Sequence, residues 1–273
     1  MKKLFYLFFL LSVSVLKAQE TLPIYADYLS DNVYLVHPAA AGIGNCAKLR
    51  ITHRQQWPNN IEFPSLQTFS FQTKVGEKTG LGFIFYNDRN GFHSQQGFQA
   101  TYAYHISLGN NHQIFNQLSF ALSISLIENS IDERTFTTPD PVISGIIRNS
   151  NYFNADFGMA YHYKGLSSYF TVRNILLSDR TLLNSDFESL NLRRYIGLIG
   201  YYFLKDRAWQ LEPSIMGQYI ELTKESFIDF NLKVYKKLDS DNLLWFALSY
   251  RRSFDNNPVQ NFQQIRRNRQ KGG

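Results

Sequence analysis

The chain has little charge and almost no cysteine. Charged residues make up 18% of its 273 residues, below the roughly 25% of soluble globular domains, whereas aromatic residues reach 16%. The single cysteine, Cys46, excludes an internal disulfide framework and a cysteine metal cluster. No stretch reaches the roughly 18 consecutive apolar residues of a membrane helix. These deficits exclude a bundle of membrane helices, and the aromatic content excludes a disordered chain.

The body of the chain also lacks positive charge. The formal net charge is +6, and a group of positive residues at the two ends more than accounts for it. These residues are Lys2, Lys3, Lys17, Arg266, Arg267, Arg269 and Lys271. Nucleic-acid-binding domains carry a basic face on the domain itself, so nucleic acid is not an expected partner.

The first 18 residues have the pattern of a secretory signal peptide. Lys2 and Lys3 precede an apolar run over 4–16, and Ala18 supplies the small residue before a cleavage site. The run is too short to span a bilayer. We therefore expect cleavage after Ala18 and export of the mature chain; an uncleaved anchor is the alternative.

Apolar and polar residues alternate with a period of two along most of the remaining chain, which predicts strands. In the clearest run, Leu122 and Ile124 alternate with Ser123 and Ser125, so the leucine and isoleucine are expected to face lipid and the serines the interior. About eleven such runs, each about 9 to 12 residues, have the length of strands that cross a bilayer at a tilt. They lie near 47–57, 66–75, 79–88, 96–108, 116–128, 152–163, 167–175, 194–203, 208–220, 227–237 and 243–252.

Short and long connections alternate between these runs. The longer ones are 58–65, 89–95, 129–151 and 176–193. Outer-membrane barrels have short periplasmic turns and longer extracellular loops, so the sequence predicts an all-β, antiparallel transmembrane outer-membrane β-barrel with 129–151 outside the cell and 164–166 in the periplasm. Aromatic residues near strand ends agree with interfacial girdles: Trp57, Tyr86, Tyr104, Tyr163, Tyr202, Tyr219 and Tyr250. The alternative is an exported soluble β-sandwich.

The sequence reveals no catalytic or metal-binding constellation. The common zinc-protease, serine-hydrolase and phosphate-loop motifs are missing. His105 and His162 alternate with apolar residues and are expected to face the interior as hydrogen-bonded side chains. We therefore expect no enzymatic activity, no cofactor and no metal; the alternative, a membrane-embedded hydrolase, requires a serine–histidine pair that the sequence does not single out.

Several short motifs follow the signal peptide in a fixed order. They are His37-Pro38-Ala39-Ala40-Ala41-Gly42, Arg54-Gln55-Gln56-Trp57, Pro64, Gly80-Leu81-Gly82, Asp88 with Gly91, and Tyr102-Ala103-Tyr104. Their order and spacing resemble the first part of the PorP/SprF family of type IX secretion membrane proteins, which has asparagine where this chain has His37. The residues carried over from the family are Pro38, Ala41, Gly42, Arg54, Gln56, Trp57, Pro64, Gly80, Gly82, Asp88, Gly91, Tyr102 and Tyr104.

The resemblance implies a function as well as a fold. It implies a barrel in the outer membrane of a Gram-negative bacterium that acts in type IX secretion, in the delivery or anchoring of large surface adhesins and in gliding motility. The implied partners are outer-membrane lipid, type IX secretion components and a large secreted surface protein. At the outer rim, Asp88 and Gly91 are expected in the second outer loop. There Asp88 either pairs with Arg54 or, as the alternative, serves with Gly91 only to form the turn. The alternative function is a passive pore for small solutes.

The expected organisation has four parts. They are a signal peptide at 1–18, a periplasmic extension at 19–46, a barrel at 47–254 and a basic non-barrel tail at 255–273. Because the family implies about fourteen strands where about eleven are visible, a truncated or frame-altered C-terminus is expected. The alternative is a native tail with one further strand near 259–265.

Overall fold

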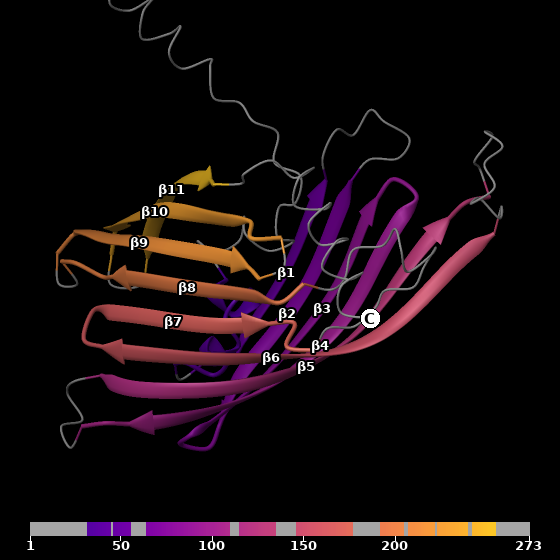
Figure 1. Cartoon of the computed structure of the whole chain (residues 1–273). Helices are drawn as coiled ribbons and strands as arrows, with labels where there is room; N and C mark the ends of the chain where they lie inside the picture. Colours follow the sequence, from indigo (N-terminus) through magenta and orange to yellow (C-terminus); the bar gives the residue numbers. More distant parts are fainter. Residues whose placement is uncertain are drawn as a thin grey trace, which may run out of the picture.

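The computed structural model describes residues 32–44, 46–55, 64–109, 115–134, 146–176, 192–204, 207–221, 223–239 and 242–254. Within them, eleven strands form one antiparallel sheet in chain order. The sheet curls so strongly that β8–β10 run crosswise to β1–β4 (Figure 1). The strands are β1 (Lys48–Gln55), β2 (Ser65–Val75), β3 (Thr79–Asn90), β4 (His93–Ser107), β5 (Asn116–Asp132), β6 (Ile147–Tyr163), β7 (Leu166–Arg173), β8 (Arg194–Tyr201), β9 (Trp209–Ile220), β10 (Ser226–Lys237) and β11 (Leu243–Ser253).

All eleven predicted strands are present, which confirms the all-β fold, but two hairpins differ from the prediction. The predicted loop 89–95 is a two-residue turn, because β3 continues to Asn90 and β4 begins at His93. Gly91 has a φ of +61° in this turn, a conformation that glycine adopts without a steric penalty. Asp88, expected in a loop, is therefore a strand residue.

The hairpin of β5 and β6 is also longer than predicted. Each of these strands has 17 residues, and their ladder runs to the pair Asp132 and Ile147. Beyond that pair, the Glu133 N–H donates to the Ile146 carbonyl at 3.1 Å. The side chains of Arg148 and Glu133 form an ion pair of 3.1 Å at this end. The hairpin is therefore a continuous ladder to its last described residues.

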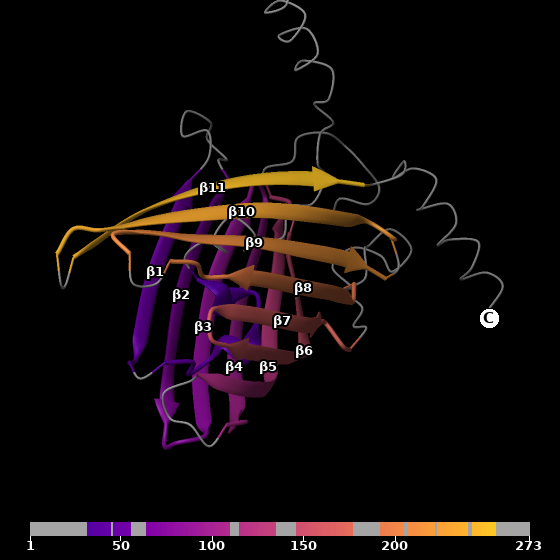
Figure 2. The same cartoon turned by 90° about the vertical axis from the view of Figure 1, so that its left-hand side faces the viewer.

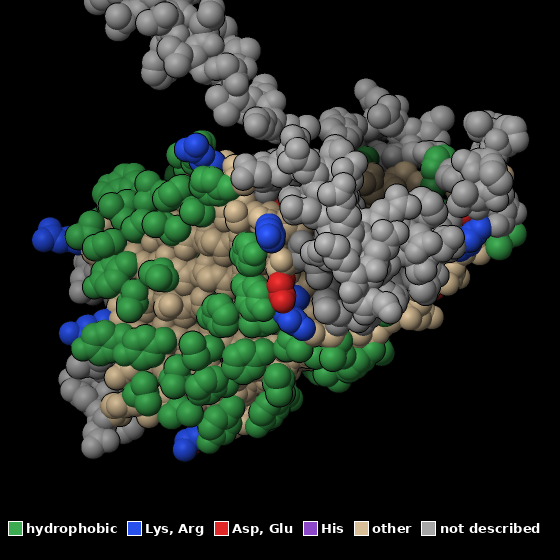
Figure 3. Space-filling view, viewed as in Figure 1, with side chains coloured by type: hydrophobic (Ala, Val, Ile, Leu, Met, Phe, Trp, Pro, Cys, Tyr) green, Lys and Arg blue, Asp and Glu red, His purple; other side chains and the backbone are tan. Residues whose placement is uncertain are grey.

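The two faces of the sheet carry the side chains that the alternation predicts. Leu122 is 60% exposed on the outer face, whereas Ser123 is 1% exposed on the inner face. Apolar side chains cover much of the outer surface (Figure 3). Tyr102 and Tyr104 are exposed on this face. Tyr86 was expected in a girdle but points inward, where its ring fills the space that a side chain at Gly97 would need.

The outer face changes character between two neighbouring rows of residues across β3–β6. One row is apolar and consists of Phe85, Phe98, Leu126 and Phe153. The next row toward the β3–β4 turn is polar and consists of Asn87, Gln96, Glu128 and Asn151. Aromatic residues gather where the apolar band of a barrel meets the polar phase. The border of the band therefore lies between these two rows.

The described sheet is open along one seam. β1 pairs with β2 and β11 with β10, and no register joins β1 to β11 within the described strands. Figure 2 shows β11 alongside β10, on the side of β10 that faces away from β9. The further strand that the sequence offers as an alternative near 259–265 falls on residues outside the described part of the chain.

A local distortion marks the ladder between β8 and β9. It breaks after the pair Gly200 and Ser214 and resumes as an isolated bridge between Phe203 and Leu211. Pro213 lies at the break and cannot donate a ladder hydrogen bond, which accounts for the distortion.

Candidate functional site: a segment docked inside the sheet

Residues 32–44, which we call the inner segment, lie against the inner face of the curled sheet. The segment contains two short 3-10 turns, η2 (Val33–Leu35) and η3 (Pro38–Ala40). Its residues from Tyr34 to Gly42 are all buried. The η3 turn lies against β4, β5 and β6. The sequence predicts a periplasmic extension for 19–46, and residues 32–44 of it pack against the inner face of the sheet.

Glycines on the sheet allow the backbone of the inner segment to approach closely. A side-chain carbon at Gly80 would overlap the Ala41 carbonyl, and one at Gly82 would overlap the Tyr34 ring. Gly42 has a φ of +74°, and a side-chain carbon there would lie 2.5 Å from the Gly80 Cα. The structure thus brings two motifs separated in sequence into one contact, Pro38-to-Gly42 against Gly80-to-Gly82.

Replacing Gly82 by leucine should detach the N-terminal part of the inner segment. The Tyr34 side chain occupies the space that the leucine would need, and overpacking a filled site costs about 1–3 kcal/mol. We expect faster chymotrypsin cleavage after Tyr34 or Leu35 in the folded Gly82→Leu chain. Gly197→Leu is the matched control, because a side-chain carbon at Gly197 meets nothing within 4 Å. Equal cleavage of both variants would contradict this account of the contact.

Hydrogen bonds from three strands hold the inner segment in place. The Tyr34 hydroxyl donates to Thr101 Oγ1 at 3.0 Å, and the Thr101 and Ser123 hydroxyls are 2.8 Å apart. At the other end of the segment, the Gly42 N–H donates to Gln72 Oε1 at 3.2 Å. His105 Nε2 lies 3.1 Å from the Ala41 carbonyl, and its Nδ1 lies 2.8 Å from Ser119 Oγ. His105 is therefore an inward-facing, hydrogen-bonded side chain, as predicted.

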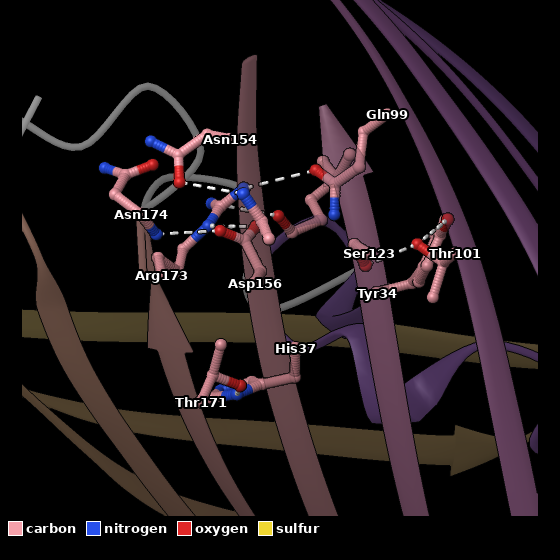
Figure 4. A network of polar contacts seen from close by, with 12 residues as sticks. Tyr34, His37, Gln99, Thr101, Ser123, Asn154, Asp156, Thr171, Arg173 and Asn174 are labelled. Carbon is pink, nitrogen blue, oxygen red and sulfur yellow. Dashed lines mark hydrogen bonds and ion pairs between the residues drawn. The ribbon is translucent and has the colours of Figure 1, made fainter. Parts of the chain in front are cut away.

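A buried ion pair forms the centre of the polar contacts. Arg173 Nε lies 3.2 Å from Asp156 Oδ2, and the two side chains are 17% and 3% exposed. The other guanidinium nitrogens donate to the Leu35 carbonyl at 3.4 Å and to Gln99 Oε1 at 3.3 Å. The second Asp156 oxygen accepts from the Asn174 N–H at 2.8 Å. Figure 4 shows Arg173 beside Asp156, and Thr171, on the same strand as Arg173, next to His37. The pair therefore joins β4, β6 and β7 to the inner segment.

His37 is a fully buried side chain between the η2 and η3 turns of the inner segment. Its Nδ1 lies 2.8 Å from Thr171 Oγ1, and its ring stacks on Tyr169 with the ring centres 5.1 Å apart. Nε2 has no hydrogen-bond partner among the described residues. Burial, with a smaller contribution from the Arg173 guanidinium, lowers the pKa of His37 to about 3. The imidazole is therefore neutral in the docked segment at physiological pH.

The remaining motif residues have separate positions. Arg54 and Asp88 flank Leu66 in one register row on the inner side, close enough for Arg54 to act on the Asp88 carboxylate electrostatically. Pro64 directly precedes β2. Gln56 and Trp57 lie outside the described residues.

Sequence reasoning missed the residues that fasten the inner segment, namely Tyr34, Asp156, Thr171 and Arg173. The inward positions of Asp156, Thr171 and Arg173 follow from the period-two alternation of their strands, whereas Tyr34 lies in the η2 turn, where there is no alternation. Nothing local to Arg173 indicates its partner Leu35, 138 residues away.

The described part of the chain holds no group of three or more histidine, cysteine, aspartate or glutamate side chains that could bind a metal ion. Among its described residues there is also no helix with the length and apolarity needed to cross a membrane.

Comparison with known proteins gives one finding. The sequence matches the family described as type IX secretion system membrane protein PorP/SprF over residues 17–267. No curated protein matches the sequence.

Proposed function

Because the chain belongs to the PorP/SprF family of type IX secretion system membrane proteins, we propose that it is a non-enzymatic outer-membrane barrel that supports the delivery or anchoring of a large surface adhesin, and through it gliding motility. The signal peptide predicted at 1–18 supports export of the chain. Its proposed partners are other type IX secretion components and the secreted surface protein itself.

The inner segment is the observation that favours this role over a passive pore. A barrel that conducts small solutes needs an aqueous channel lined by its inner face. Here the inner face of β4–β6 is covered by the η3 turn, and Arg173 and Asp156 are tied to each other and to the segment. A barrel occupied in this way is better suited to bind proteins than to admit solutes.

The outer face supports contact with lipid. Leu122, Ile124 and Leu126 are each more than half exposed on one strand, and outward apolar side chains along a barrel strand form the band that faces the hydrocarbon core. The border between the apolar row at Phe85 and the polar row at Asn87 gives this band a defined edge.

Two measurements together test the proposed function. An affinity-tagged chain purified from solubilised outer membranes should bring with it a large secreted surface protein and type IX components, whereas an unrelated tagged barrel should not. In planar bilayers the purified chain should conduct no ions. Steady ion conductance without any specific protein partner would support the passive pore instead.

The orientation of the barrel gives a further prediction. In a Cys46→Ser background, a cysteine introduced as Asp140→Cys should react with a membrane-impermeant maleimide on intact cells, because 129–151 is the longest predicted loop and outer-membrane barrels place long loops outside. Lys164→Cys, in the two-residue turn between β6 and β7, should react only after the outer membrane is permeabilised. The reverse labelling would overturn the orientation.

A further inference from the structure

His37 differs from every other hydrogen-bonding group of the inner segment in how it would respond to a proton. Its Nδ1 is paired with Thr171 Oγ1, and its Nε2 is buried with no partner in the part of the chain that the structure describes. The neutral ring tolerates this arrangement because only one nitrogen carries hydrogen. The protonated ring carries hydrogen on both nitrogens, so it would place a cation and an unsatisfied N–H in a fully buried position, which is strongly unfavourable.

The charged groups around His37 do not compensate such a cation. From β7, the Arg173 guanidinium repels it. From β6, the Asp156 carboxylate is already bound to Arg173 and to the Asn174 N–H. The remaining titratable neighbours are Tyr169, whose ring stacks on His37, and His162, whose Nε2 lies 2.8 Å from the Tyr169 hydroxyl.

The second histidine in contact with the segment behaves differently. His105 on β4 has partners at both ring nitrogens, the Ala41 carbonyl and Ser119 Oγ. A protonated His105 keeps its bond to the Ala41 carbonyl, because that carbonyl accepts from an N–H in either state. Protonation of His105 therefore leaves neither of its ring N–H groups without an acceptor, whereas protonation of His37 leaves its Nε2–H unsatisfied among the described residues.

We propose that His37 makes docking of the inner segment proton-sensitive, so that the segment stays docked at neutral pH and is released in mild acid while the strands remain paired. Release would uncover the inner face at Gly80, Gly82 and Arg173, a regulated opening that goes beyond the proposed role in secretion.

The sign of the effect follows from linkage. The released segment binds a proton near pH 6.5, the ordinary pKa of histidine, whereas the docked segment resists protonation down to about pH 3. Docking free energy is thus fully present above pH 6.5 and decreases as the pH falls from 6.5 toward 3. One proton per release event corresponds to a change of about tenfold in the docking equilibrium per pH unit.

A cysteine-accessibility measurement on the full chain tests this inference. Ala39 is fully buried in the segment, and the native Cys46 is exposed, so an Ala39→Cys chain carries a buried reporter and an internal reference. After maleimide labelling and peptide mass spectrometry, the labelling rate at position 39 relative to Cys46 should rise by about tenfold per unit as the pH is lowered from 6.5 to 4.5. Gel mobility of the unheated chain should show the folded form throughout.

The control variant is His37→Asn in the same background, since its amide can bond to Thr171 but does not titrate. This variant should lose the pH dependence, whereas His105→Gln should keep it. An unchanged ratio in the His37 chain, an equal slope in His37→Asn, or loss of the folded mobility in step with labelling would each overturn the proposal. None of these outcomes depends on a secretion partner, so the inference is tested separately from the proposed function.

Discussion

Replacing Arg173 by alanine should lower the free energy of unfolding by about 3–5 kcal/mol, the usual loss when one partner of a buried ion pair is removed. The substitution would leave the Asp156 carboxylate, 3% exposed, with the Asn174 N–H as its remaining donor among the contacts described above. It would also remove the donors to the Leu35 carbonyl and Gln99. Urea unfolding of the chain in lipid vesicles, followed by heat-modifiable gel mobility, measures the loss.

The chain offers a matched control for this substitution. Arg134 forms a comparable ion pair with Asp132 at 2.7 Å, but its side chain is 61% exposed. Because exposed ion pairs contribute little, Arg134→Ala should leave the unfolding transition almost unchanged. Adding Asp156→Asn to Arg173→Ala should recover part of the loss, since it removes the uncompensated charge. Equal transitions for Arg173→Ala and Arg134→Ala would show that the buried pair does not hold the fold.

Leu122→Arg should impair insertion by roughly 2–4 kcal/mol, the cost of an arginine on the lipid face near the bilayer midplane. Leu122 lies two rows inside the border formed by Phe98 and Leu126, and it is 60% exposed on the outer face. The yield of heat-modifiable folded barrel in vesicles reports insertion.

The control for Leu122→Arg must point inward into an open polar space. Ser123 does not qualify, because it is buried beside Thr101 under the inner segment. Asn231 on β10 is suitable, since it lines an inner cavity together with Lys233 and Glu212. Asn231→Arg should insert nearly as well as the unmodified chain. Equal impairment by the two substitutions would indicate a sheet buried on both faces, as in a soluble sandwich.

The strands could be predicted from the sequence because each carries its own evidence. The alternation around Leu122 and Ser123 is set by the pleat of the strand and needs no knowledge of distant residues. For the same reason, the inward position of His105 could be predicted. The sequence predicts a shorter hairpin of β3 and β4 than the structure has. The residues near its turn are polar on both faces, so the apolar–polar alternation stops there although the backbone pairing continues.

The inner segment could not be predicted on these grounds. The stretch from His37 to Gly42 has neither strand nor helix periodicity and is therefore expected to be a loop. The position of the inner segment depends on close backbone approach at Gly80 and Gly82, about 40 residues further along the chain. The family resemblance identified both motifs but not their contact. Likewise, the partners of Arg173 become apparent only once β4, β6 and β7 are assembled in one curled sheet.

The long hairpin of β5 and β6 has a mechanical consequence for whatever binds at its end. From Glu128 in the polar row to Asp132 at the end of β5, the strand rises about 13 Å along its axis, and β4 accompanies it as far as the pair His93 and Ile131. The Arg148–Glu133 ion pair fixes the far end. A partner that bound at this end would be held away from the lipid headgroups by paired strands. A force applied to it would therefore act as a torque on the barrel wall, because the hydrogen-bonded ladder does not stretch as an unpaired loop would.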